Sequence, residues 1–129
     1  MNATRPFYSH EPDDKIMIKK DQLEIGNWTD DLEYINEELE YLLDIEDRII
    51  NNAQLYQNLH EIRRENQLRL GELYRYEGNI RNARECDTAA CDAFYLYNHE
   101  KTRTNYMAHL KKYRSIKSKI FSQILQNRD

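Results

Sequence analysis

Apolar residues recur every three or four positions along most of the chain, which is the spacing of one face of an α-helix. The clearest case begins after Gly26 and Asn27. Thr29 or Asp30 can cap the first turn there, and acidic residues follow in that turn, as helix N-termini prefer. We therefore predict a first helix over residues 28–50. Its apolar stripe consists of Trp28, Leu32, Ile35, Leu39, Leu42 and Ile49.

A second stripe follows after a change of phase beyond Ile49. The polar pair Asn51-Asn52 lies at this change, so we predict a turn there. A second helix should then run from about Ala53 to Cys86, with a less apolar face than the first. This stripe, which Asn66 and Glu77 interrupt, consists of Leu55, Leu59, Ile62, Leu70, Leu73, Ile80 and Ala83.

A third helix is predicted from Asp87-Thr88, which can cap it, to about Gln126. One face runs along its whole length at a mean step of about 3.7 residues. The second half of this face is isoleucine, whereas the first half carries a thiol, phenols and imidazoles. The stripe consists of Cys91, Tyr95, His99, Thr102, Tyr106, His109, Tyr113, Ile116, Ile120 and Ile124.

The pattern predicts an all-α protein in which three long amphipathic helices form an elongated bundle or coiled coil. The sequence contains three glycines and two prolines but no valine, which is one of the commonest residues of β-strands, so a β fold is not expected. The alternative is a long two-helix hairpin that turns at Gly78-Asn79, with about 48 residues in each helix. Three helices are favoured because a phase change is harder to absorb than one glycine, which costs about 1 kcal/mol relative to alanine.

We expect residues 1–20 to form a flexible arm and residues 21–129 to form a single helical-bundle domain. The arm contains both prolines, Pro6 and Pro12, and has no sustained apolar period. No apolar run approaches the roughly 18 residues that a membrane-spanning helix needs, so no membrane span is predicted. The N-terminal sequence lacks the basic start and apolar core of a secretory signal, so we expect a cytoplasmic protein.

Charge is distributed by segment. Residues 28–52 contain nine acidic residues and one basic residue, a net charge of −8, whereas residues 101–128 contain eight basic residues and no acidic residue, a net charge of +8. These segments can pair within the chain. Alternatively, the third helix binds nucleic acid or another anionic surface, although the total charge of −4 disfavours nucleic acid. The basic face would consist of Lys111, Lys112, Arg114, Lys117 and Lys119.

The sequence contains no motif of a catalytic or cofactor site. A di-iron bundle needs Glu-x-x-His, but the residues three positions before His60, His99 and His109 are glutamine, leucine and tyrosine. Cys91, His99 and His109 are acceptable zinc ligands, but about 12 Å and about 15 Å of helical rise separate them. We therefore expect no enzyme activity, no cofactor and no metal. A metal-binding or small-ligand bundle is an alternative that needs ligands from another helix, where His60 is the candidate.

The third helix is predicted to need a partner. The helices should have about 23, 33 and 38 residues, so the first is too short to cover the third. Ten tyrosines in 129 residues also suit contact surfaces. We therefore expect a non-enzymatic helical interaction module that forms a homo-oligomer, most simply a dimer, or binds an unidentified protein. The expected contact residues are Tyr95, His99, Tyr106, His109 and Tyr113.

Overall fold

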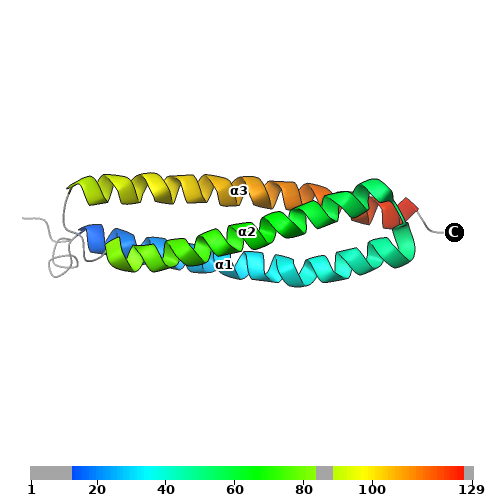
Figure 1. The fold of residues 1–129 in the computed structure, drawn as a ribbon, viewed down its shortest axis with the longest axis horizontal. Helices are drawn as coiled ribbons and strands as arrows, with labels where there is room; N and C mark the ends of the chain where they lie inside the picture. Colours follow the sequence, from blue (N-terminus) through cyan, green and yellow to red (C-terminus); the bar gives the residue numbers. More distant parts are fainter. Residues whose placement is uncertain (1–12, 84–88, 127–129) are drawn as a thin grey trace, which may run out of the picture.

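The computed structural model describes residues 13–83 and 89–126 of the chain. In order, the elements are the helix α1 (Asp13–Ile45), the short π-helix η2 (Glu46–Ile50), and the helices α2 (Ala53–Ala83) and α3 (Ala89–Gln126). No strand occurs in the described residues, so the predicted all-α three-helix bundle is confirmed. In Figure 1 the bundle is elongated, with α1 and α3 running in one direction and α2 in the other. None of these helices combines the length and the apolar character needed to span a membrane.

The connection between α1 and α2 lies at Asn51-Asn52, as predicted. Asn51 adopts the left-handed backbone conformation (φ 53°, ψ 55°), and its N–H donates to the backbone oxygen of Glu46 at 2.7 Å. Asn52 caps α2, because its Oδ1 accepts from the N–H groups of Gln54 at 2.9 Å and Leu55 at 3.1 Å. Asparagine tolerates the left-handed region and is a preferred N-cap, so two adjacent asparagines end one helix and begin the next.

The alternative turn at Gly78-Asn79 is wrong, because α2 continues through both residues to Ala83. Gly78 has no positive φ, and a Cβ placed on it would meet no atom within 4 Å. The core face continues past it, since Leu73 and Ile80 are one heptad apart and both are buried. Burial of this face outweighs the cost of about 1 kcal/mol for one helical glycine.

The first helix begins well before the predicted N-cap. α1 starts at Asp13, so residues 13–20 of the predicted arm are helical, and residues 1–12 lie outside the part of the chain that the structure describes. The helix then passes through Gly26 and Asn27 without a break.

Two buried isoleucines explain this longer helix. Ile18 and Ile25 precede Leu32 at steps of seven residues, and all three side chains are buried. Burying an isoleucine contributes about 1.5–3 kcal/mol, which exceeds the cost of about 1 kcal/mol for Gly26 in a helix. Thr29, one of the predicted N-caps, lies within α1, and its buried hydroxyl has no hydrogen-bond partner among the described residues.

The π-helix η2 changes which isoleucine enters the core. The predicted stripe places Ile49 in the core, but Ile49 is exposed and Ile50 is buried. A π-helical turn contains more residues than an α-helical turn, so the buried face moves by one position. Glu46 is also buried here, and its carboxylate accepts the N–H of Asn52 at 3.0 Å, which helps to close the turn.

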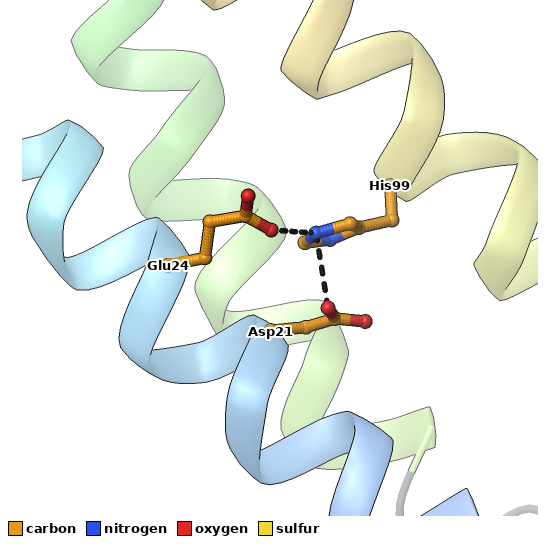
Figure 2. A group of neighbouring side chains, drawn as sticks. All are labelled: Asp21, Glu24 and His99. Atoms are coloured by element: carbon orange, nitrogen blue, oxygen red, sulfur yellow. Dashed lines mark hydrogen bonds and ion pairs between the residues drawn. The ribbon is translucent and has the colours of Figure 1, made fainter.

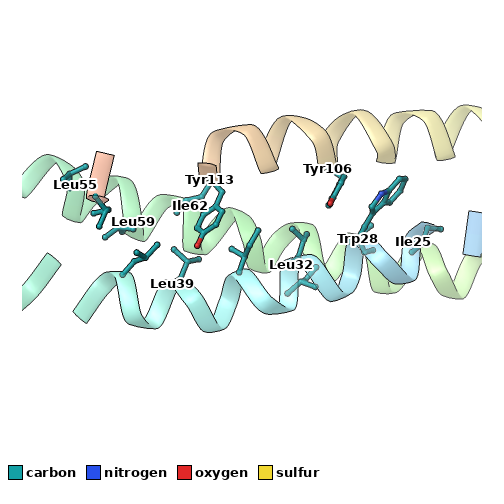
Figure 3. Close-up of a cluster of buried hydrophobic side chains, with 14 of the residues drawn as sticks. Ile25, Trp28, Leu32, Leu39, Leu55, Leu59, Ile62, Tyr106 and Tyr113 are labelled. Carbon is teal, nitrogen blue, oxygen red and sulfur yellow. The ribbon is translucent and has the colours of Figure 1, made fainter. Parts of the chain in front are cut away.

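The core is mostly leucine and isoleucine from α1 and α2, to which α1 adds Trp28 and α3 adds Tyr106, Tyr113 and Ile120 (Figure 3). Leu32, Leu39 and Leu59 have no exposed surface. Truncating leucines buried in this way to alanine typically costs about 2–5 kcal/mol. In Figure 3, Tyr106 and Tyr113 extend from α3 with their hydroxyl groups toward α1. The contact between α1 and α2 is therefore largely apolar. In the contact between α1 and α3, side chains of α3 reach α1 with polar groups.

Candidate functional site

A polar ladder of three rungs joins α1 to α3. Each rung pairs a carboxylate of α1 with a ring of α3: Glu24 with His99, Asp31 with Tyr106, and Glu38 with Tyr113. Successive rungs are seven residues apart on both helices, so the two partners always differ by 75 positions. Two helices that run in the same direction keep this register, because seven residues make nearly two turns. The rungs therefore fix α3 lengthwise against α1.

The rungs are direct hydrogen bonds between buried rings and carboxylates. The nitrogen–oxygen distance in the first rung is 2.8 Å, and the hydroxyl–carboxylate distance in the second is 2.5 Å. Burial, together with the adjacent carboxylate, raises the pKa of Tyr106 and of Tyr113, so both hydroxyl groups remain donors. The Trp28 indole stacks between the first two rungs, with its ring centroid 5.4 Å from that of His99 and 5.1 Å from that of Tyr106.

Two cations reinforce the first and third rungs, each four residues after the ring of its rung. Arg103 donates to both oxygens of Glu24, at 2.8 Å and 3.2 Å, and Lys117 lies 2.8 Å from Glu38. The hydrogen bond from Arg103 holds the pKa of Glu24 below its ordinary value. Burial opposes ionisation of Glu38, but hydrogen bonds from Lys117 and Tyr113 outweigh it and lower the pKa of Glu38.

A second carboxylate distinguishes the first rung from the other two. Asp21 Oδ1 lies 3.2 Å from His99 Nε2, so the carboxylates of Asp21 and Glu24 converge on one ring nitrogen (Figure 2). The other ring nitrogen, Nδ1, contacts the hydroxyl of Tyr76 on α2 at 2.9 Å. His99 is 3% exposed, whereas both carboxylates are partly exposed. The site is therefore closed on the ring side and reachable through its carboxylates.

A second buried histidine lies further along α3. His109 Nε2 donates to Asn66 Oδ1 at 2.8 Å, because the Asn66 amide nitrogen donates to the carbonyl oxygen of Leu32 at 2.8 Å and to Asn36 Oδ1 at 2.7 Å. Burial lowers the pKa of His109, so its ring is neutral at pH 7. Its Nδ1 has no hydrogen-bond partner among the described residues and lies 3.8 Å from a carboxylate oxygen of Glu65.

The residues predicted to contact a partner lie mostly inside the bundle. His99, Tyr106, His109 and Tyr113 are buried, whereas Tyr95 is on α3 but its side chain lies outside the described part of the structure. The longer first helix explains this for His99, which meets Asp21 and Glu24 in the added part of α1. Tyr106 and Tyr113 instead bond to α1 residues inside the predicted first helix, and His109 bonds to Asn66 on α2. These four side chains therefore hold the bundle together instead of forming an outer surface.

The predicted basic face is partly used within the chain. Lys112 Nζ lies 2.6 Å from a carboxylate oxygen of Glu65 on α2, and Lys117 bonds Glu38 on α1. The other three bases are exposed and make no salt bridge with any described residue: Lys111, Arg114 and Lys119. Pairing within the chain therefore accounts for part of the charge pattern, and it removes two of the five bases from the nucleic-acid alternative.

Sequence reasoning misses Asp21 and Glu24, because they lie before the predicted first helix. The signal that could have found Glu24 is its step of seven residues to Asp31, which matches the step between the rings on α3. His60, the ligand candidate from another helix, packs instead against Tyr56, with ring centroids 4.3 Å apart.

Comparison of the chain with family models, with curated proteins and with solved structures gives no match. Two features of the molecule bear on its function: the exposed surface beside the polar ladder, and the two carboxylates at His99.

Proposed function

We propose that the protein is a non-enzymatic interaction module that pairs with a second copy of itself through the face shared by α1 and α3. The observation that carries this proposal is a row of exposed apolar side chains on α3. Their steps of 11, 14 and 4 residues keep them within about 40° of one another around the helix. They are Leu96, Met107, Phe121 and Leu125, which are 45%, 58%, 46% and 68% exposed.

The row lies on the side of α3 that is next to α1. Arg103 and Lys117 reach carboxylates of α1, and they mark this side of α3. Met107 follows Arg103 by four residues, and Phe121 follows Lys117 by four residues. Residues four apart are neighbours on a helix surface, so the apolar row borders the seam between the two helices.

α1 adds two tyrosines to the same face. Tyr34 and Tyr41 are exposed and lie four residues before and three residues after Glu38, which bonds to α3. Single exposed apolar residues are ordinary, but tyrosine, phenylalanine and methionine are enriched at the centres of protein interfaces. Apolar side chains on both helices along one seam therefore favour a docking surface.

Charge complementarity favours a second copy as the occupant. Residues 28–52 carry a net charge of −8 and residues 101–128 carry +8. A two-fold axis that lies in this face and runs parallel to the helices sets α1 of each copy against α3 of the other, so acidic and basic helices meet twice.

The cytoplasmic location and the absence of enzyme activity stay predictions.

Sedimentation equilibrium tests this proposal. The chain has a mass of 15.7 kDa, and we expect a species of about twice that mass at micromolar concentrations. Met107→Glu places a charge in the apolar row and should weaken association at least about tenfold. Leu68→Glu is the matched control, because Leu68 is equally exposed on α2, and this variant should associate as the wild type does.

Two results contradict the proposal. One is a wild-type protein that remains monomeric at about 100 μM. The other is an equal loss of association in both variants, which would show that the α1–α3 face does not form the interface between the copies. Circular dichroism of both variants checks that their helices are retained.

A further inference from the structure

The surroundings of His99 have the spacing of a metal centre. Asp21 Oδ1, Glu24 Oε1 and His99 Nε2 all lie within 4.8 Å of one another. The nitrogen is 3.2 Å from the first oxygen and 2.8 Å from the second. An ion bound at about 2.1 Å by nitrogen and oxygen holds adjacent ligand atoms about 3.0–3.4 Å apart, and the larger value belongs to tetrahedral Zn²⁺. The nitrogen therefore already lies near this separation from both oxygens.

We propose that Asp21, Glu24 and His99 bind one divalent transition-metal ion, for which Zn²⁺ is the probe. An imidazole nitrogen combined with carboxylates suits this class, whereas Ca²⁺ and Mg²⁺ take oxygen ligands. The ligands come from α1 and α3, so the ion joins the two helices at this end of the ladder. This site stands independently of the proposed dimer.

The ring of His99 is held in the orientation that a ligand needs. Its Nδ1 contacts Tyr76 Oη at 2.9 Å, which leaves Nε2 directed at the carboxylates (Figure 2). With a metal at Nε2, the Nδ1–H donates to this hydroxyl oxygen. Metal-binding histidines are usually oriented by such a contact at their other nitrogen. Trp28 supports the ring from one face, with centroids 5.4 Å apart.

The charge around His99 favours a cation. Arg103 is the positive partner of Glu24 and also of Glu100, and Asp21 faces the histidine. These three carboxylates and one guanidinium have a formal charge of −2. One divalent ion neutralises these four groups, and opposite charges at this distance attract strongly in a partly buried site.

Titration with ZnCl₂ by calorimetry tests the site. The protein carries Cys86→Ser and Cys91→Ser, so that no thiol competes, and is treated with EDTA and dialysed first. We expect one Zn²⁺ per chain. His99→Gln removes the nitrogen ligand but keeps a donor for Glu24, and Asp21→Asn removes a carboxylate with little change of shape. Each should lower the affinity at least about tenfold.

Glu38→Gln is the matched control, because Glu38 accepts hydrogen bonds from Tyr113 and Lys117 in the third rung, two heptads away. This variant should bind Zn²⁺ as the wild type does. Thermal unfolding without metal verifies that each variant is folded, and Asp21→Asn decides the matter if His99→Gln is not. The proposal is overturned if the cysteine-free protein binds no Zn²⁺, or if Asp21→Asn binds it as tightly as its parent.

Discussion

His99 and His109 are ten residues apart on α3 and are almost equally buried, at 3% and 2% exposure, yet their surroundings differ in charge. His99 faces two carboxylates, whereas His109 donates to the neutral amide of Asn66. The carboxylate nearest His109, that of Glu65, is 3.8 Å away and also binds Lys112. Two almost equally buried histidines therefore lie in different electrostatic surroundings, and of the two it is His99 that has two carboxylates beside one ring nitrogen.

The two sites also differ in how their polar groups are satisfied. The Asn66–His109 pair belongs to a buried network in which the amide of Asn66 donates twice and accepts once, whereas His109 Nδ1 has no hydrogen-bond partner among the described residues. Such a network specifies how the helices pack and is costly to disrupt. The carboxylates of the His99 site are partly exposed to solvent. We therefore assign a packing role to His109, whereas His99 is the histidine for which metal binding is proposed.

The largest effect is expected from breaking the hydrogen bonds of Asn66. Asn66→Ala leaves His109 Nε2–H without its acceptor, leaves Asn36 Oδ1 without the N–H that it accepts, and opens a cavity. We therefore expect it to lower the free energy of unfolding by about 3 kcal/mol. Asp21→Asn should lower it by less than about 1 kcal/mol, because the carboxylate is partly exposed. Urea unfolding at pH 7 measures both. Equal losses would contradict the distinction between the two sites.

A smaller effect is expected on the pH dependence of folding stability, to which His109 contributes. The pKa of His109 is lowered from its ordinary value of 6.5, first by burial and also by Arg69 and Lys112, against the opposing charge of Glu65. As pH falls below 6.5, His109 is therefore protonated in the unfolded chain before it is protonated in the folded chain. The stability from the neutral ring is present above pH 6.5 and is lost as pH falls through the folded value.

His109→Gln keeps a donor for Asn66 but cannot titrate, so its urea midpoint should fall less than that of the wild type between about pH 7 and about pH 5. Below the ordinary glutamate pKa of 4.5, both proteins should lose stability together, because three carboxylates have lowered pKa values: Glu24, Glu38 and Glu65. If the urea midpoints of the two proteins change in parallel over the whole pH range, His109 does not cause the loss of stability between about pH 7 and about pH 5.

The smallest effect concerns the cation beside His99. Arg103 Nη2 lies 2.8 Å from the oxygen of Glu24 that faces His99, so Arg103 competes with a metal ion for this oxygen. Arg103→Gln should therefore raise the Zn²⁺ affinity by about threefold to tenfold. Lys117→Gln, which removes the corresponding cation of the third rung, should leave the affinity unchanged. A weaker affinity in Arg103→Gln would mean that the arginine positions Glu24 for the metal.

The sequence predicts the parts of the fold that depend on regular apolar stripes. Leu39, Leu59 and Ile120 belong to the three predicted stripes, and all are fully buried. The turn at Asn51-Asn52 follows from a change of phase at residues that suit a left-handed turn and an N-cap. Both signals are local, since each comes from the periodicity or the conformational preference of neighbouring residues.

The remaining features depend on contacts that periodicity does not report. Ile18 and Ile25 extend the core stripe, but the residues between them are mostly polar, so the start of α1 is not visible in the sequence. The π-helix shifts the core from Ile49 to Ile50 through its own turn geometry. Glu24 and His99 are 75 positions apart in the sequence, and their pairing depends on how α1 and α3 are aligned in the bundle. The spacing of residues along one helix does not report this alignment.

The most direct test of the contrast between the two histidines is ¹⁵N nuclear magnetic resonance of their imidazole rings at pH 7, with and without one equivalent of Zn²⁺. The account predicts that the ring nitrogens of His99 shift on addition of the metal. Those of His109 should remain at the positions of a neutral ring with its proton on Nε2. Unchanged His99 resonances, or a metal-dependent shift at His109, would contradict the account.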